Sequence, residues 1–188
     1  MWGDIDGGLP LAVAPAFSDT VRLRPAGAED AAELYRLSGP SMPDALVERR
    51  PEFYRRRASD FMVCTVAGAI AGCLGVQRFG GLAELYNVCV DAPWRGRGIG
   101  GLLTASAVLR LHLDGVPEVV LFSRTAVTWF AWLGFEPADE SILPPERRDL
   151  IDRCRGSLLL HRPTRPDSLL VAALRVDWRM PEPLPCRS

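Results

Sequence analysis

Four glycines and two arginines lie close together in residues 95–101, which read RGRGIGG. The segment follows an apolar run ending VCVDAPW and precedes a long apolar stretch, so it is predicted to join a strand to the start of a helix. The first turn of a helix presents unpaired N–H groups that bind anions, and glycine allows close approach to that backbone. The arginines add positive charge. The segment therefore predicts a loop that binds phosphate or pyrophosphate.

Three phosphate-binding patterns compete for this loop. A P-loop needs a lysine, and all 22 basic residues of the chain are arginine, so that pattern is excluded. Gly96, Gly98 and Gly101 satisfy G-x-G-x-x-G, but a dinucleotide-binding loop follows its strand directly, whereas DAPWR intervenes here. The pattern R-x-x-G-x-G is met by Arg95, Gly98 and Gly100. A glycine-rich turn without a ligand is the remaining interpretation.

Apolar periodicity predicts the elements that position the loop. We expect one α/β domain over residues 21–162, preceded by a leader (1–20) and followed by an extension (163–188) whose structure the pattern does not assign. Strands are expected at 21–25, 61–68, 69–79, 82–90, 118–122 and 157–161, and helices at 28–38, 45–59 (one helix or a helix pair), 99–113, 126–134 and 144–155.

Composition excludes several classes of protein. The 188 residues carry a net charge of −1, which gives no reason to expect nucleic acid or an anionic membrane as a partner. The five cysteines show no C-x-x-C spacing and the two histidines lie far apart, which argues against a disulfide framework or a metal site. The sequence shows neither a signal-peptide pattern nor an apolar run of membrane-spanning length. We therefore expect a cytoplasmic protein without a metal.

The loop after VCVDAPW, the hairpin FMVCTVAGAIAGCLG and the closing WFAWLGFEP resemble the GNAT acetyltransferase superfamily over about residues 21–161. The resemblance implies a GNAT α/β fold: a central, mixed, largely antiparallel sheet with a V-shaped splay, flanked by helices. It also implies acetyl-CoA as co-substrate. The pantetheine arm would lie along the backbone of Val88, Cys89 and Val90. The pyrophosphate would bind the loop residues Arg95, Gly96, Arg97, Gly98, Ile99, Gly100 and Gly101.

Two other stretches, LVERRPEFYRRRASDF and ILPPERRDLIDRCRGSLLLH, are similar to the acetyltransferase domain of N-acetylglutamate synthases. By that resemblance Arg49, Arg155 and Ser157 bind the acceptor, and arginine suits the two carboxylates of glutamate because its guanidinium binds carboxylates bidentately. The other arginines of these stretches, at 55–57 and 147–148, are expected to be solvated helix faces.

The same resemblance assigns the catalytic candidates. Glu84 matches an acidic position and is the candidate general base for the acceptor amine, and Ser123, in the turn after the fifth strand, is the second catalytic candidate. Phe130 stands where many GNAT enzymes carry a tyrosine that protonates the departing thiolate. A thiol with a pKa around 8.5 leaves without a dedicated acid, so activity is still expected.

The expected function is direct acetyl transfer to the α-amine of a small amino acid, with L-glutamate favoured, which would place the reaction in arginine biosynthesis. Two alternatives stay open: another small amine or a protein N-terminus as acceptor, and a non-catalytic module that binds acyl-CoA. Whether the chain forms a homodimer is also left open.

Overall fold

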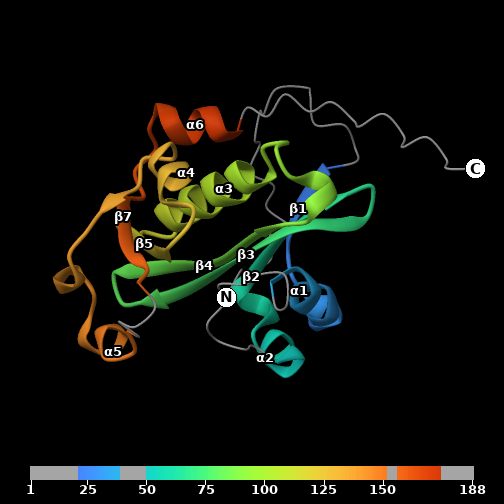
Figure 1. The fold of residues 1–188 in the computed structure, drawn as a ribbon, viewed down its shortest axis with the longest axis horizontal. Coiled ribbons are helices and arrows are strands. Elements are labelled where there is room, and N and C mark those ends of the chain that lie inside the picture. The colour runs from blue at the N-terminus through green and yellow to red at the C-terminus, as the bar shows by residue number, and fades with distance from the viewer. Residues whose placement is uncertain (1–20, 39–49, 152–155, 175–188) are drawn as a thin grey trace, which may run out of the picture.

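The chain folds around a seven-stranded sheet flanked by helices (Figure 1). In this computed structural model, residues 21–38, 50–151 and 156–174 are described. The strands are β1 (Val21–Pro25), β2 (Phe61–Val66), β3 (Ala69–Phe79), β4 (Leu82–Val90), β5 (Glu118–Ser123), β6 (Glu136–Pro137) and β7 (Leu158–Pro163). The helices are α1 (Ala31–Ser38), α2 (Pro51–Arg56), α3 (Ile99–Leu113), α4 (Val127–Ala131), α5 (Pro145–Arg148) and α6 (Ser168–Leu174).

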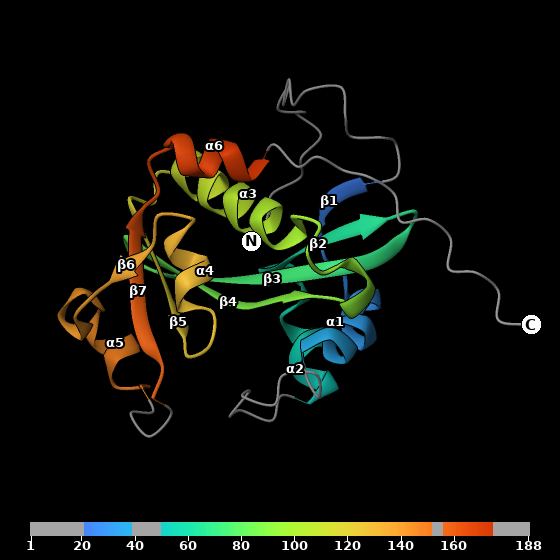
Figure 2. The same ribbon diagram turned by 45° about the horizontal axis from the view of Figure 1, so that its top comes forward.

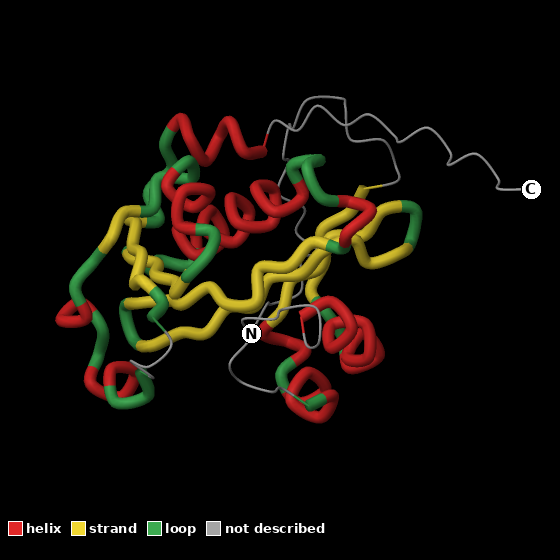
Figure 3. The backbone as a smooth tube through the Cα atoms, in the orientation of Figure 1, coloured by secondary structure: helices red, strands yellow, loops and turns green. Residues whose placement is uncertain are grey.

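The strands follow the order β1-β2-β3-β4-β5-β7-β6, and the tubes of Figure 3 show them as one continuous sheet. Neighbouring strands of the described sheet are antiparallel, except that β4 and β5 are parallel. Their pairing runs only from Leu82 to Leu85 on β4 and from Glu118 to Leu121 on β5. Beyond that point both strands continue unpaired with each other. The expected mixed sheet with a V-shaped splay is therefore confirmed.

Helices cover both faces of the sheet. Figures 1 and 2 show α3, α4 and α6 on one face and α1 and α2 on the other. All six residues of β2 are buried, because a strand covered on both faces has no solvent side. The face with α1 and α2 carries two separate apolar clusters. One surrounds Tyr54 and Phe61, and the other joins Leu82 of β4 to Val120 of β5 and Leu143.

The helix α6 is an element that the apolar pattern left unassigned. It packs on α3, and at Gly101 the two helices approach so closely that an added Cβ would lie 3.6 Å from the Cβ of Ala173. Arg162 of β7, 2% exposed, anchors this end of the chain: its Nη2 donates to Asp167 at 2.9 Å, and Asp167 accepts from the backbone of Leu170. The packing of α6 on α3 joins segments far apart in the sequence, so no local pattern indicates it.

Three predicted helix ranges were wrong in extent. Of the range 45–59, residues 45–49 lie outside the described residues, and the α-helix in the rest is α2, which ends at Arg56 before a separate 3-10 turn at Ala58–Asp60. The helix expected at 144–155 is a single turn, α5, because beyond Arg148 the backbone bonds change to three-residue spacing: Leu150 N–H donates to the carbonyl of Arg147 and Ile151 N–H to that of Arg148. The helix expected at 126–134 is α4, which ends at Ala131 before a turn closed by Gly134 with φ +80°. No helix within the described ranges has the length and apolarity to cross a membrane.

Candidate active site

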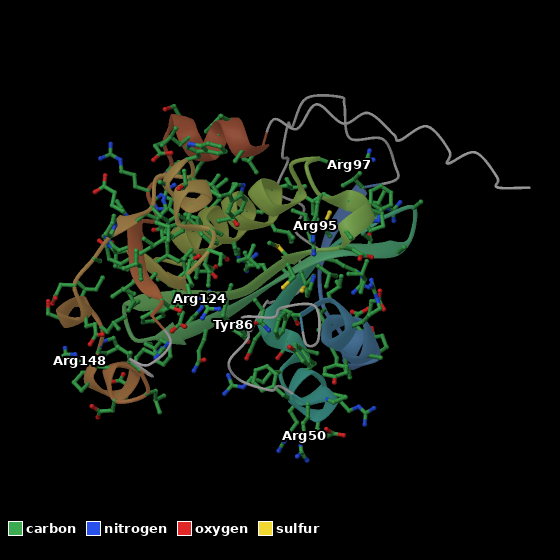
Figure 4. All side chains as sticks on the ribbon, viewed as in Figure 1. Arg50, Tyr86, Arg95, Arg97, Arg124 and Arg148 are labelled. Carbon is green, nitrogen blue, oxygen red and sulfur yellow. The ribbon has the colours of Figure 1, made fainter. Side chains whose placement is uncertain are left out.

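The glycine-rich loop begins where β4 ends, and its backbone is held in place by its own arginines. Arg95 Nε donates to the carbonyl of Val90 at 3.0 Å, and Arg97 Nε donates to that of Pro93 at 3.3 Å. Gly96 and Gly98 have φ of +73° and +80°, a region that glycine enters without strain. Gly98 caps α3, so the next N–H groups are those of a helix N-terminus. Figure 4 shows Arg95 and Arg97 beside the start of α3.

An ion pair ties the same loop to α1. Asp91 follows β4 and accepts hydrogen bonds from the N–H of Ala92 at 2.9 Å and from Arg36 Nη2 at 2.8 Å. The pKa of Asp91 is lowered below its usual value, mainly because its carboxylate accepts a hydrogen bond from the Arg36 guanidinium. This interaction between distant residues lay outside the sequence-based predictions, because the spacing of Arg36 and Asp91 carries no local pattern.

The strand β4 carries a bulge just before the residues expected to bind pantetheine. Tyr86 pairs with Gly75 and Cys89 with Cys73, so Asn87 and Val88 together face one residue of β3. Asn87 has φ +49°, which asparagine tolerates better than most residues. A bulge leaves a residue outside the regular ladder. Here the carbonyl of Asn87 accepts from Cys73 Sγ at 3.8 Å. The Asn87 side chain donates to the Tyr54 hydroxyl at 3.2 Å.

The two neighbouring aromatic residues of α4 have different surroundings: Trp129 contacts the loop, and Phe130 lies in the core. The indole of Trp129 lies against Gly100 and near Val90, at the start of α3. Phe130 is 6% exposed and packs edge-on against Phe135 within the main core. The ring that replaces the tyrosine of many GNAT enzymes is thus a core residue here.

Glu84 is buried and paired. Its carboxylate accepts from Arg147 Nη2 at 3.0 Å and also from Arg147 Nε, and the guanidinium lies over the Phe122 ring, 4.8 Å from the centroid. The side chains of Glu84 and Arg147 are 12% and 15% exposed. The prediction that Arg147 lies on a solvated helix face was therefore wrong. Sequence spacing offers no signal for a pair 63 residues apart.

The other predicted site residues are only partly placed. Ser123 is buried at the end of β5, and its Oγ accepts from the N–H of Ala126 at 3.1 Å, which shapes the turn into α4. Ser157 is half-buried just before β7. Arg49 and Arg155, the two predicted carboxylate ligands, lie outside the described residues.

The face of the sheet opposite α3 carries the side chains of Glu84, Tyr86 and Phe122. Alternation along β4 sends Ala83 and Leu85 into the core beside α3, so Glu84 and Tyr86 point to the other face. The Tyr86 ring crosses Gly75 of β3, where an added Cβ would lie 2.5 Å from the ring. In Figure 4 Tyr86 and Arg124 are labelled between α5 and the α1–α2 pair, while Arg148 lies on α5.

Metal ligation has no support in the part of the chain that is described: no three histidine, cysteine, aspartate or glutamate side chains there are grouped to hold an ion.

Comparison with known proteins agrees with this architecture. Residues 57–137 match the acetyltransferase (GNAT) domain family. An amino-acid acetyltransferase of Aeromonas salmonicida is 27% identical over 142 residues, which cover 74% of this chain and 32% of that protein. A mycothiol acetyltransferase of a Nocardioides species is 40% identical over 86 residues, covering 44% of this chain and 28% of that protein. The chain thus spans about a third of the length of these curated relatives.

Among solved structures, N-acetylglutamate synthase from Neisseria gonorrhoeae, in complex with coenzyme A and N-acetyl-glutamate, superposes with a TM-score of 0.73 at 25% identity. The superposition covers 79% of this chain and 36% of that one. Together with the splayed sheet and the glycine-rich loop at the start of α3, these matches show a GNAT-like α/β fold, with the sequence pattern of the acetyltransferase (GNAT) domain over residues 57–137.

Proposed function

We propose that this protein is an acetyl-CoA-dependent N-acetyltransferase that acts on the α-amine of a small amino acid, L-glutamate first. The observation that carries the proposal is the loop from Arg95 to Gly101, which follows a bulged strand at a sheet splay and opens α3. Glutamate as the acceptor is supported by the superposed N-acetylglutamate synthase, and it would make the reaction a step of arginine biosynthesis in the cytoplasm.

The loop fits the phosphates of coenzyme A. A Cβ at Gly96 would meet no atom within 4 Å, so the backbone there is open to a ligand. The N–H groups at the start of α3 favour an anion, and the outer guanidinium nitrogens of Arg95 and Arg97 add charge. In this proposal Val88, Cys89 and Val90 lie along the pantetheine arm.

The chain's own groups suit a direct transfer. Acetyl-CoA supplies a thioester. The N–H of Val88, at the bulge, would donate to the carbonyl oxygen of this thioester. Glu84 would take the proton of the acceptor amine, because each carboxylate oxygen has a lone pair beyond the one bonded to Arg147. Ser123 would shape the turn beside them, and Arg49, Arg155 and Ser157 would bind acceptor carboxylates.

An acetyl-enzyme is not part of the proposal. Cys73 and Cys89 are buried, and a hydrogen bond that the Cys73 thiol donates to the Cys89 side chain, together with burial, raises the pKa of Cys73 well above its usual value. A protonated buried thiol is a poor nucleophile.

The test has two measurements. Calorimetric titration with coenzyme A tests the loop, and a panel of amines with acetyl-CoA, followed by mass spectrometry and thiol release, tests turnover. The proposal expects coenzyme binding and acetylation of glutamate above the other amines. Binding without turnover of any amine would instead support a non-catalytic acyl-CoA module, and a preference for peptide N-termini would overturn the amino-acid assignment.

A further inference from the structure

The pair formed by Glu84 and Arg147 holds a guanidinium in one fixed orientation. Three elements contribute to it: Glu84 comes from β4, Arg147 from α5, and Phe122, whose ring lies under the guanidinium, from β5. The pair lies at the vertex of the splay, because Glu84 is one residue before the last paired position of β4, and Phe122 is one residue beyond the last paired position of β5.

Each partner keeps hydrogen-bonding capacity that the pair does not use. A guanidinium has five N–H donors, and Arg147 directs Nε and one N–H of Nη2 at Glu84. Within the described parts of the chain, no group accepts a hydrogen bond from Arg147 Nη1. The edge formed by Nη1 and Nη2 is therefore able to bind a second carboxylate bidentately. Glu84 likewise has lone pairs that can accept from a cation.

A donor edge beside an acceptor carboxylate is complementary to one kind of ligand. The zwitterion of a free α-amino acid carries an ammonium and a carboxylate on the same carbon. Its ammonium can donate to Glu84 while its carboxylate accepts from the outer edge of Arg147. A protein N-terminus has an amide in place of this carboxylate, and a simple amine has nothing there. The pair matches free amino acids and neither of the other two acceptors.

We propose that Arg147 binds the α-carboxylate of the acceptor beside the ammonium held by Glu84, and so restricts the acceptors to free α-amino acids. This inference rests on the proposed acetyltransferase function and names the residue that selects its substrate class.

A purely structural pair would behave differently. If Arg147 only anchored α5 to the sheet, its loss would lower stability and reduce activity on every acceptor alike. If Arg147 instead selects the acceptor, its loss changes the ratio of the kcat/KM values for two acceptors, both measured with the same variant. That ratio does not depend on how much of the enzyme is folded.

The experiment compares L-glutamate with two amides. L-Isoglutamine has an amide in place of the α-carboxylate, and L-glutamine has an amide in place of the side-chain carboxylate. In the parent, kcat/KM for glutamate should exceed that for isoglutamine. In Arg147→Lys, which keeps the charge but lacks the fork, this preference should fall by roughly 10- to 100-fold, while the preference over glutamine changes little. The matched control is Arg148→Lys, because the Arg148 side chain donates to the carbonyls of Ser141 and Leu143 and, among the described residues, makes no ion pair with Glu84. In Arg148→Lys, the kcat/KM ratios of glutamate to isoglutamine and of glutamate to glutamine should both equal those of the parent.

An unchanged ratio of glutamate to isoglutamine in Arg147→Lys would overturn the inference, and so would a fall confined to the ratio with glutamine. If no acceptor is acetylated, the proposed function fails, and calorimetry with coenzyme A present then tests Arg147 by itself. The parent should bind glutamate more tightly than isoglutamine, and Arg147→Lys should abolish the difference. Equal binding of both compounds by the parent would also overturn the inference.

Discussion

The indole of Trp129 and the backbone of Gly100 are in close contact: a Cβ added to the glycine would lie 3.1 Å from Cζ2 of the ring. The contact joins α4 to the first turn of α3, where the coenzyme phosphates are proposed to bind. The next residue, Gly101, has room, since its added Cβ would lie 3.6 Å from Ala173.

These two glycines make a matched pair of variants. Gly100→Ala should displace Trp129 and weaken coenzyme A binding in calorimetry, with a lower Tm. Gly101→Ala should raise stability by about 0.5–1 kcal/mol, because alanine loses less conformational entropy in a helix. Equal coenzyme affinity in Gly100→Ala and the parent would show that the position of Trp129 does not matter to the loop.

The strands β1 to β5 and β7 and the place of the loop could be predicted from the sequence because they depend on local patterns. The hairpin of β2 and β3 shows continuous apolar runs about a turn at Ala67 and Gly68, and Gly96 and Gly98 of the loop have the positive φ that favours glycine. The elements that were missed depend on distant partners. The helix α6 packs on α3, and Arg147 of α5 pairs with Glu84, which lies 63 residues before it in the sequence.

The left-handed backbone at Gly98 gives a second prediction. Gly98→Val should be strained by about 1–2 kcal/mol and should block close approach of a phosphate, so coenzyme A affinity should fall sharply. Gly80 is the control: its φ is +58° in the turn between β3 and β4, with open space around it. Gly80→Val should lower the Tm by a similar amount with the affinity unchanged. Unchanged affinity in Gly98→Val would contradict the assignment of the loop.

Replacing Phe130 with the tyrosine of related enzymes should not increase activity. The ring lies 4.7 Å from that of Trp129 and 5.6 Å from that of Phe135, between centroids, inside the core. A hydroxyl placed there without a partner costs about 1–3 kcal/mol. Phe130→Tyr should therefore lower the Tm and leave kcat no higher than in the parent. A higher kcat with an unchanged Tm would mean that the ring reaches the leaving thiolate.

The predicted acceptor arginines are tested by exchange for lysine. If Arg155 and Arg49 bind carboxylates of glutamate, Arg155→Lys and Arg49→Lys should each raise KM for glutamate by an amount equivalent to about 2–5 kcal/mol, because an ammonium lacks the fork. KM for acetyl-CoA should barely change. If glutamate saturation is the same in both variants as in the parent, the side-chain carboxylate has other ligands.

Glu84→Gln separates the proposed base from its structural pairing. The amide keeps the shape of the side chain but cannot take a proton, so kcat should fall by about 10²–10⁴-fold while KM for acetyl-CoA stays unchanged. The variant also leaves the Arg147 charge without its partner in a mostly buried site, so the Tm should fall as well. Glu118→Gln is the control, since Glu118 on β5 pairs with His161 at the surface. It should leave kcat at the parent value. The two readouts distinguish the roles: a lower Tm with kcat preserved in the folded fraction would make Glu84 a structural partner of Arg147 and leave the amine to lose its proton to another group.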